Sequence, residues 1–156
     1  MKKLFPVALL LLFVALAAFV VRVEVTLDDE ADREAVREAV LDYVEGIYEV
    51  EPDRIKRSVH PELAKVGYWL QKDATEYREG RMTYEQLVEL AGSWNAKGRI
   101  DAQTAPKEIE IFDVMDQTAT VKLSAHWGVD HMQLAKIEGK WMIMNVLWQS
   151  YPPDAQ

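Results

Sequence analysis

The last third of the chain, from Lys107 to Trp148, alternates apolar and polar residues and is interrupted at short intervals by turn residues. Alternation with a period of two is typical of strands that bury one face of a sheet. The pattern predicts a four-stranded antiparallel meander. The strands are expected at about 108–115, 118–127, 130–138 and 140–149, with tight turns at 116–117, 127–128 and 138–139. The preceding residues are expected to cover one face of this sheet.

Those preceding residues have helical periodicity. Apolar residues recur every three or four positions between Asp29 and Glu49, which predicts a first helix. Its buried stripe is expected to be Val36, Val40, Tyr43, Val44 and Ile47. Pro52 suits the first turn of a second, short helix, which His60 and Pro61 should end because a residue before proline is disfavoured in α geometry.

A third helix is expected from Thr83, where Thr83 and Gln86 have the spacing of a capping box, to a stop near Gly98. Residues 66–70 and 75–77 could form a short hairpin around 72–73. The order of elements predicts an α+β fold, in which a curved antiparallel sheet forms a cone packed on three N-terminal helices. The domain is expected to span residues 29–150.

The turn positions determine which side chains share a face of the sheet. Two-residue turns at 127–128 and 138–139 would place Asp130 and Asn145 on the face that the helices cover. The rest of this face would be Val121, Leu123, Ala125, Met132, Leu134, Trp141, Ile143 and Leu147. The outer face would carry Met142, Met144, Val146 and Trp148, an apolar patch suited to a homodimer contact. In the first strand of the meander, the apolar residues change from one face to the other partway along, and a bulge near 111–112 would account for this change.

Composition excludes several classes of function. The chain of 156 residues has no cysteine, so it has no disulfide, thiolate metal site or thiol nucleophile. The formal net charge is −8, which disfavours nucleic acid as a partner. The sequence contains no glycine-rich phosphate loop or serine nucleophile elbow. His126 and His131 lack a suitable carboxylate neighbour, so no metal and no cofactor are expected.

The N-terminal segment, residues 1–21, has a basic start followed by an apolar run from Leu4 to Val21. This layout predicts a secretory signal peptide, with a small-residue cleavage candidate at 15–17. The run is also just long enough to span a bilayer, so the alternative is an uncleaved anchor formed by residues 4–21. Both interpretations predict an exported domain, in the periplasm or secreted, in a bacterial envelope.

The ordered set of elements resembles the nuclear transport factor two-like superfamily. The resemblance rests on the opening helix 35–48, on Ser58 to Leu63, on Met82 to Leu87, and on the closing pattern from Asp130 to Trp148. Within the superfamily, the sequence is most similar to the bacterial branch named putative lumazine-binding, among polyketide-cyclase-like and ketosteroid-isomerase-like proteins. The resemblance implies a cavity between sheet and helices. Its members include enzymes and binders, so it does not assign a function.

Asp130 is the sharpest candidate for a site residue, because a carboxylate on an apolar face needs a partner or a function. The structural alternative is that it accepts hydrogen bonds from turn amides or from Asn145. His60, at the expected cone mouth, is a further polar candidate. Aromatic residues could line the cavity or simply belong to the core. The aromatic candidates are Tyr43, Tyr68, Trp94 and Trp141.

The sequence therefore favours a non-catalytic protein that binds a small apolar or aromatic molecule in an aromatic-lined cone. One alternative is an isomerase-like or cyclase-like enzyme with Asp130 as general base. It is disfavoured because no partner pair of tyrosine and acid is evident on neighbouring strands. The other alternative is a protein-interaction module that uses the outer sheet face, whose methionines make an adaptable surface.

Overall fold

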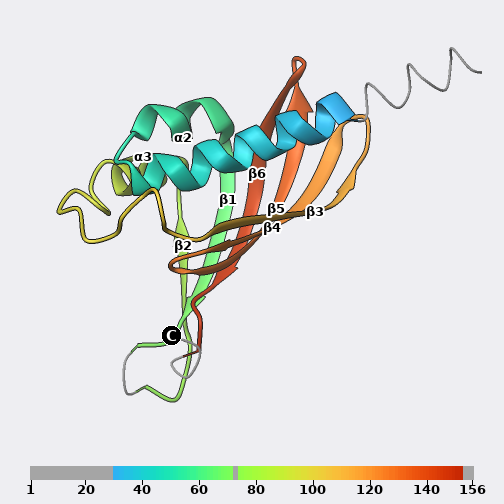
Figure 1. Ribbon diagram of the computed structural model, residues 1–156. Helices are drawn as coiled ribbons and strands as arrows, with labels where there is room; N and C mark the ends of the chain where they lie inside the picture. Colours follow the sequence, from blue (N-terminus) through green and yellow to red (C-terminus); the bar gives the residue numbers. More distant parts are fainter. Residues whose placement is uncertain (1–29, 72–73, 153–156) are drawn as a thin grey trace, which may run out of the picture. The chain divides into compact units, whose positions relative to one another are not determined.

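The computed structural model describes residues 30–71 and 74–152 (Figure 1). The chain separates into two compact units, Met1–Asp32 and Arg33–Gln156, and all described strands belong to the second. The predicted α+β class is confirmed. The described elements are a helix over 30–48, α2 Pro52–Ser58, β1 Val59–Trp69, β2 Arg78–Met82, α3 Tyr84–Ala91, β3 Lys107–Val114, β4 Thr118–Ala125, β5 Gly128–Ile137 and β6 Lys140–Gln149.

The six strands form one curved, open sheet in the order β2-β1-β6-β5-β4-β3. β1 and β6 run parallel, whereas the other neighbouring strands are antiparallel. The predicted meander is present as β3 to β6. A hairpin is also present, but the prediction that its second strand is residues 75–77 was wrong, because the second strand is β2, Arg78–Met82. β1 already begins at Val59, because Val59 and residues 64–68 pair with β6, whereas the second helix had been expected to end at His60.

The register of β5 and β6 was predicted correctly only near their shared turn. Lys136 pairs with Trp141 and Leu134 with Ile143, as expected. Beyond these pairs a bulge shifts the register, so that Gln133 pairs with Asn145 and Asp130 with Trp148. The extra residue on β6 reverses the facing of its last residues. The prediction that Asn145 and Leu147 face inward, and Val146 and Trp148 outward, was therefore wrong.

The turn between β4 and β5 lies at 126–127, one residue earlier than predicted. Leu123 therefore pairs with Asp130 and Val121 with Met132. A shift of two positions in pairing leaves each side chain on its expected face, because facing alternates with period two. The predicted bulge in β3 is confirmed, since the register shifts between Ile111 and Asp113.

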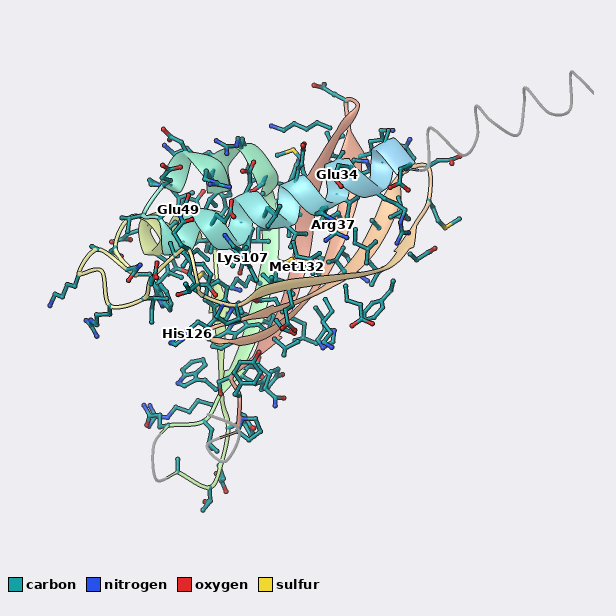
Figure 2. All side chains as sticks on the ribbon, viewed as in Figure 1. Glu34, Arg37, Glu49, Lys107, His126 and Met132 are labelled. Carbon is teal, nitrogen blue, oxygen red and sulfur yellow. The ribbon has the colours of Figure 1, made fainter. Side chains whose placement is uncertain are left out.

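The first helix crosses the sheet and covers one of its faces (Figure 1). Its predicted stripe is buried, and all five side chains are at most 2% exposed: Val36, Val40, Tyr43, Val44 and Ile47. They pack against inward-facing sheet residues such as Leu123, Met132 and Ile143, which are fully buried. Figure 2 shows Lys107 just below the second half of this helix, where its Nζ lies 2.5 Å from Oε1 of Glu45.

The short helices are held by caps and ion pairs. In α3, Thr83 and Gln86 form the predicted capping box. α3 ends at Ala91 with Gly92 as its C-cap, so the predicted stop at Gly98 was too late. Arg54 of α2 bonds Asp42 and Glu45 of the first helix and Glu49 in the turn that follows it. These three charge-assisted hydrogen bonds fix α2 against the first helix.

The predicted leader, residues 1–21, lies outside the described residues. Among the helices that the structure describes, none is long and apolar enough to cross a membrane.

Candidate functional site

An inner cavity of about 220 Å³ lies between the first helix, α3 and the sheet. Most of its surface is apolar, and aromatic rings form much of its wall. The first helix, β1, β2, α3, the β4–β5 turn and β6 all contribute to it. The lining residues are Tyr43, Ile47, Lys65, Met82, Leu90, Trp94, Trp127 and Trp148.

A buried ion pair lies beside this cavity. The Asp130 side chain is 0% exposed and the Lys65 side chain 5%, and Nζ of Lys65 donates to Oδ1 of Asp130 at 3.2 Å. Oδ2 of Asp130 accepts a hydrogen bond from Nε1 of Trp127 at 2.6 Å. The prediction that Asp130 faces the covered side is confirmed. Its partners are Lys65 and Trp127, whereas Asn145 had been expected.

Lys65 also contacts two rings of the cavity wall. Its Nζ donates to the Tyr43 hydroxyl at 2.7 Å and lies 5.4 Å from the centre of that ring. The same Nζ is 5.6 Å from the centre of a Trp148 ring. The Trp148 distance is within the range of a cation–π interaction, whereas the contact with Tyr43 is the hydrogen bond to its hydroxyl. Because Tyr43 and Trp148 line the cavity, the ammonium group lies at the cavity wall.

Burial changes the acid–base behaviour of this group of side chains. Desolvation lowers the pKa of Lys65, while the charge of Asp130 and its hydrogen bond oppose that shift. The pKa of Tyr43 is raised well above its ordinary value, first by burial and then by the negative charge of Asp130 and a hydrogen bond to it. Tyr43 therefore stays a neutral phenol at physiological pH. The site contains one acid and one base of opposite charge, so its net charge is close to zero.

The remaining wall is an aromatic cluster centred on Trp127. Its ring packs edge-to-face against Tyr48 at 5.4 Å, Trp94 at 5.5 Å and Tyr43 at 6.3 Å between ring centres. The Tyr48 hydroxyl fixes this end of the sheet, because it donates to the carbonyl of Pro106 and accepts from a backbone N–H of the β4–β5 turn. Burial raises the pKa of Tyr48 to about 12. These contacts between protein groups hold the rings in place, so the wall is preformed.

Trp148 closes the cavity on the side of β1. Its indole stacks on Trp69 with ring centres 6.3 Å apart and planes 5° apart. The indole lies directly over Gly67, where an added Cβ would come within 1.8 Å of Nε1 of Trp148. Gly80 likewise leaves room for Trp69. The two glycines of the β1–β2 hairpin therefore allow two indoles to lie flat against it.

Two of the predicted aromatic residues, Tyr43 and Trp94, line the cavity. Trp141 is buried in the core at 3% exposure and does not line it. Tyr68 lies on the outer face, where its hydroxyl donates to Glu79 at 3.1 Å. The predictions that Trp141 and Tyr68 line the inner cavity were therefore wrong.

The polar candidates other than Asp130 lie elsewhere. Asn145 faces outward, and its Nδ2 donates to Oε1 of Gln133 at 2.9 Å. His60 is in β1, and its Nδ1 accepts a hydrogen bond from the backbone N–H of Glu62 at 3.2 Å. Neither residue lines the inner cavity. Sequence reasoning missed Lys65, Trp127 and Trp148, although the alternation Leu63, Lys65, Gly67 would have signalled Lys65 if β1 had been recognised.

The outer face differs from the predicted apolar patch. Val146 is buried at 2%, and Trp148 belongs to the inner cavity, whereas Leu147 is 52% exposed on the outer face. Met142 and Met144 face outward as predicted, since they alternate with buried Trp141 and Ile143. A larger and more open hollow of about 610 Å³ lies near the end of β6 on this side. Its lining includes Tyr68, Lys122, His131, Leu147 and Tyr151.

Within residues 30–71 and 74–152, no group of three or more histidine, aspartate or glutamate side chains is placed to hold a metal ion. His126 lies in the turn between β4 and β5 (Figure 2). Its ring packs against Trp94 with centres 6.2 Å apart.

A curved sheet of this topology, covered by helices around an inner cavity, defines a nuclear transport factor two-like protein. The family model described as "Putative lumazine-binding" matches residues 31–149, which is most of the chain, so the protein belongs to that family. No curated protein matches the sequence at a significant level.

Similar solved structures share this fold. One is an NTF2-like protein of unknown function from Silicibacter pomeroyi DSS-3, with a TM-score of 0.58 and 16% identity over 81% of this chain and 98% of that chain. Another, of unknown function from Shewanella baltica OS155, has a TM-score of 0.57 and 14% identity over 78% and 95%. A third, with a cystatin-like fold, is from Novosphingobium aromaticivorans, with a TM-score of 0.55 and 12% identity over 84% and 89%.

Proposed function

We propose that this protein binds a small, flat, apolar or aromatic molecule in the inner cavity. The single observation that carries the proposal is the preformed aromatic wall around an apolar cavity of about 220 Å³ with a buried ion pair beside it. Membership of a family described as lumazine-binding fits a small-molecule ligand. The family description does not by itself select lumazine for this chain.

The size of the cavity limits the ligand. An apolar cavity of about 150 Å³ binds benzene, whereas pockets for drug-sized ligands are about 300–1,000 Å³. A cavity of about 220 Å³ therefore suits one or two fused rings. The near-neutral ion pair also limits charge, because a charged ligand would lose its hydration without gaining an unpaired counter-ion.

Binding is favoured over general-base catalysis by the partners of Asp130. Each of its carboxylate oxygens already accepts a hydrogen bond, one from Lys65 and one from Trp127. A substrate proton would have to compete with an ammonium group 3.2 Å away. The alternative enzyme is thus supported less well than a binder.

Binding can be measured with toluene and indole as neutral probes, by NMR chemical shifts of the tryptophan indole N–H groups. The signals of Trp94, Trp127 and Trp148 are expected to shift with saturation, because these rings line the cavity. The signal of Trp141, which is buried elsewhere, is expected to change little. Shifts that do not saturate, or that spread evenly over all five tryptophans, would contradict the proposal.

A cavity-filling variant provides the specific test. Leu90→Trp adds an indole inside the cavity and is expected to abolish probe binding. Leu147→Trp makes the same replacement on the outer face, where the side chain is 52% exposed, and is expected to leave binding unchanged. Equal binding by both variants would place the probe elsewhere.

We also propose that the protein is exported, on the basis of the sequence of residues 1–21. Fractionation of the expressed full-length chain, with intact-mass measurement, distinguishes a cleaved leader from a retained anchor. Recovery of the intact chain only in the cytoplasmic fraction would refute export.

We propose a homodimer through the outer face, through Met142, Met144 and Leu147 in place of the patch predicted from sequence. The exposure of Leu147 supports this contact. Sedimentation equilibrium of the wild type and of Leu147→Lys tests it. A wild type that stays monomeric at high concentration would refute it.

A further inference from the structure

Lys65 differs from the other lysines of the described chain. Among residues 30–71 and 74–152, it is the only lysine that is buried. Lys56 and Lys140, for comparison, are exposed. Buried amines are the ones that proteins use for carbonyl chemistry, because desolvation favours the neutral, nucleophilic form.

The position of the amine suits a reaction with a molecule inside the cavity. Nζ lies 2.7 Å from the Tyr43 hydroxyl and 5.6 Å from the centre of a Trp148 ring, and both residues line the cavity. A flat ring held against this wall would have its substituents close to Nζ. The first requirement of such chemistry is proximity of the two reacting groups, and the position of Nζ at the cavity wall would provide it for a bound carbonyl compound.

Asp130 provides the second requirement, a place for the proton. Its Oδ1 is 3.2 Å from Nζ and its side chain is fully buried. A proton can move between ammonium and carboxylate without leaving the site. The transfer converts the ion pair into a neutral amine and a neutral acid. Burial also lowers the pKa of Lys65, which favours the same change.

We propose that Lys65 condenses reversibly with the carbonyl group of a small aromatic aldehyde or ketone bound in the inner cavity. This inference rests on the proposed function, because it uses the same cavity, and it adds the class of ligand. It also gives the ion pair a role beyond packing, as an amine with its own proton acceptor.

The reaction balances without any further reactant. Asp130 takes one proton from the ammonium group, and the amine lone pair of Lys65 attacks the carbonyl carbon while the C=O π electrons move to oxygen. A proton passes from nitrogen to that oxygen, giving a neutral carbinolamine. Asp130 then returns its proton to the hydroxyl group, which leaves as water while the nitrogen lone pair forms the C=N bond. The product is a protonated imine with a charge of +1, as before, so it keeps the pairing with Asp130.

The test uses benzaldehyde as the probe and sodium borohydride to reduce any imine to a stable benzyl amine. Peptide mapping by mass spectrometry then locates the adduct. At neutral pH, labelling at Lys65 is expected to exceed that at exposed Lys56 or Lys140 by at least about tenfold, because the cavity would hold the aldehyde beside Nζ. Lys65→Met is expected to lose this adduct.

Leu90→Trp keeps Lys65 but fills the cavity, so it too is expected to lose the adduct. It covers the case in which Lys65→Met does not fold. Leu147→Trp is the matched control and is expected to label like the wild type. Toluene, which has the same ring but no carbonyl, separates the two proposals. If toluene binds the cavity but benzaldehyde labels only exposed lysines, the imine inference is overturned and the binding function stands. If toluene does not bind and Lys65 is not labelled, both are overturned.

Discussion

Replacement of Asp130 by asparagine tests whether the ion pair is as buried as described. Asp130→Asn preserves the size of the side chain and an acceptor for Trp127, but removes the charge that balances Lys65. The ammonium group is then left unpaired in a site where its side chain is 5% exposed. Removal of one partner of a buried pair costs about 3–5 kcal/mol.

The loss of unfolding free energy in this variant also has an upper limit, because Lys65 can lose its proton and so avoid the cost of an unpaired buried charge. An ordinary lysine has a pKa of about 10.4, and each unit between that value and the working pH costs about 1.4 kcal/mol. At pH 7 the limit is therefore about 4–5 kcal/mol, and at pH 9 it is about 2 kcal/mol.

The sign of the pH dependence follows from linkage. In Asp130→Asn the folded pKa of Lys65 lies below the unfolded one, since burial already lowers it and the opposing charge is gone. Between those two pKa values the unfolded state binds more protons, so stability rises with pH. The loss relative to wild type is thus largest at and below pH 7 and shrinks toward pH 10.

The assay is urea unfolding followed by tryptophan fluorescence from pH 6 to 9. Glu110→Gln is the matched control, because Glu110 pairs with Lys122 at 3.4 Å on an exposed surface. That variant is expected to lose less than about 1 kcal/mol, with little pH dependence. A loss of under about 1 kcal/mol in Asp130→Asn that stays constant with pH would refute the burial of the Lys65 ammonium group.

Three further predictions concern backbone, cap and packing, and each is measured by urea unfolding. Val50→Gly is expected to stabilise the fold by about 1 kcal/mol, since Val50 has φ 61° and a β-branched residue is strained there; no gain would show that its packing outweighs the strain. Thr83→Ala is expected to lose about 1 kcal/mol with the α3 capping box, whereas Thr83→Ser should lose little. Gly67→Ala is expected to lose about 1–3 kcal/mol and to weaken toluene binding, because the new methyl group displaces the Trp148 indole; unchanged fluorescence and binding would contradict the flat stacking.

The sequence predicted the parts of this fold that depend on local patterns. The first helix, the capping box at Thr83, the meander and the inward facing of Asp130 all follow from periodicity or from a short motif. The bulge in β3 was predictable because alternation breaks visibly at Ile111 and Phe112.

The parts that could not be predicted depend on distant partners. Residues 59–69 form a strand because they pair in parallel with β6, about eighty positions later in the chain. Unless that pairing is known, the sequence does not indicate that the Lys65 side chain faces inward. The bulge in β6 was missed, so Asn145 was assigned to the inward face; the polar Asn145 in an otherwise apolar alternation was the only local sign of it. Trp127 was placed in a strand because the turn was set one residue too late.

The strand order has a consequence for folding. β6 is the last strand of the described sequence, yet it lies at the centre of the sheet between β1 and β5. A nascent chain that has emerged as far as β5 has both neighbours of the missing strand but no contact between them. The β1–β2 hairpin and the β3–β5 meander would therefore stay separate until the C-terminal strand is inserted. Such long-range closure is slow, and the final step also brings Trp148 against Lys65, so the ability to bind a ligand should arise only when folding is complete.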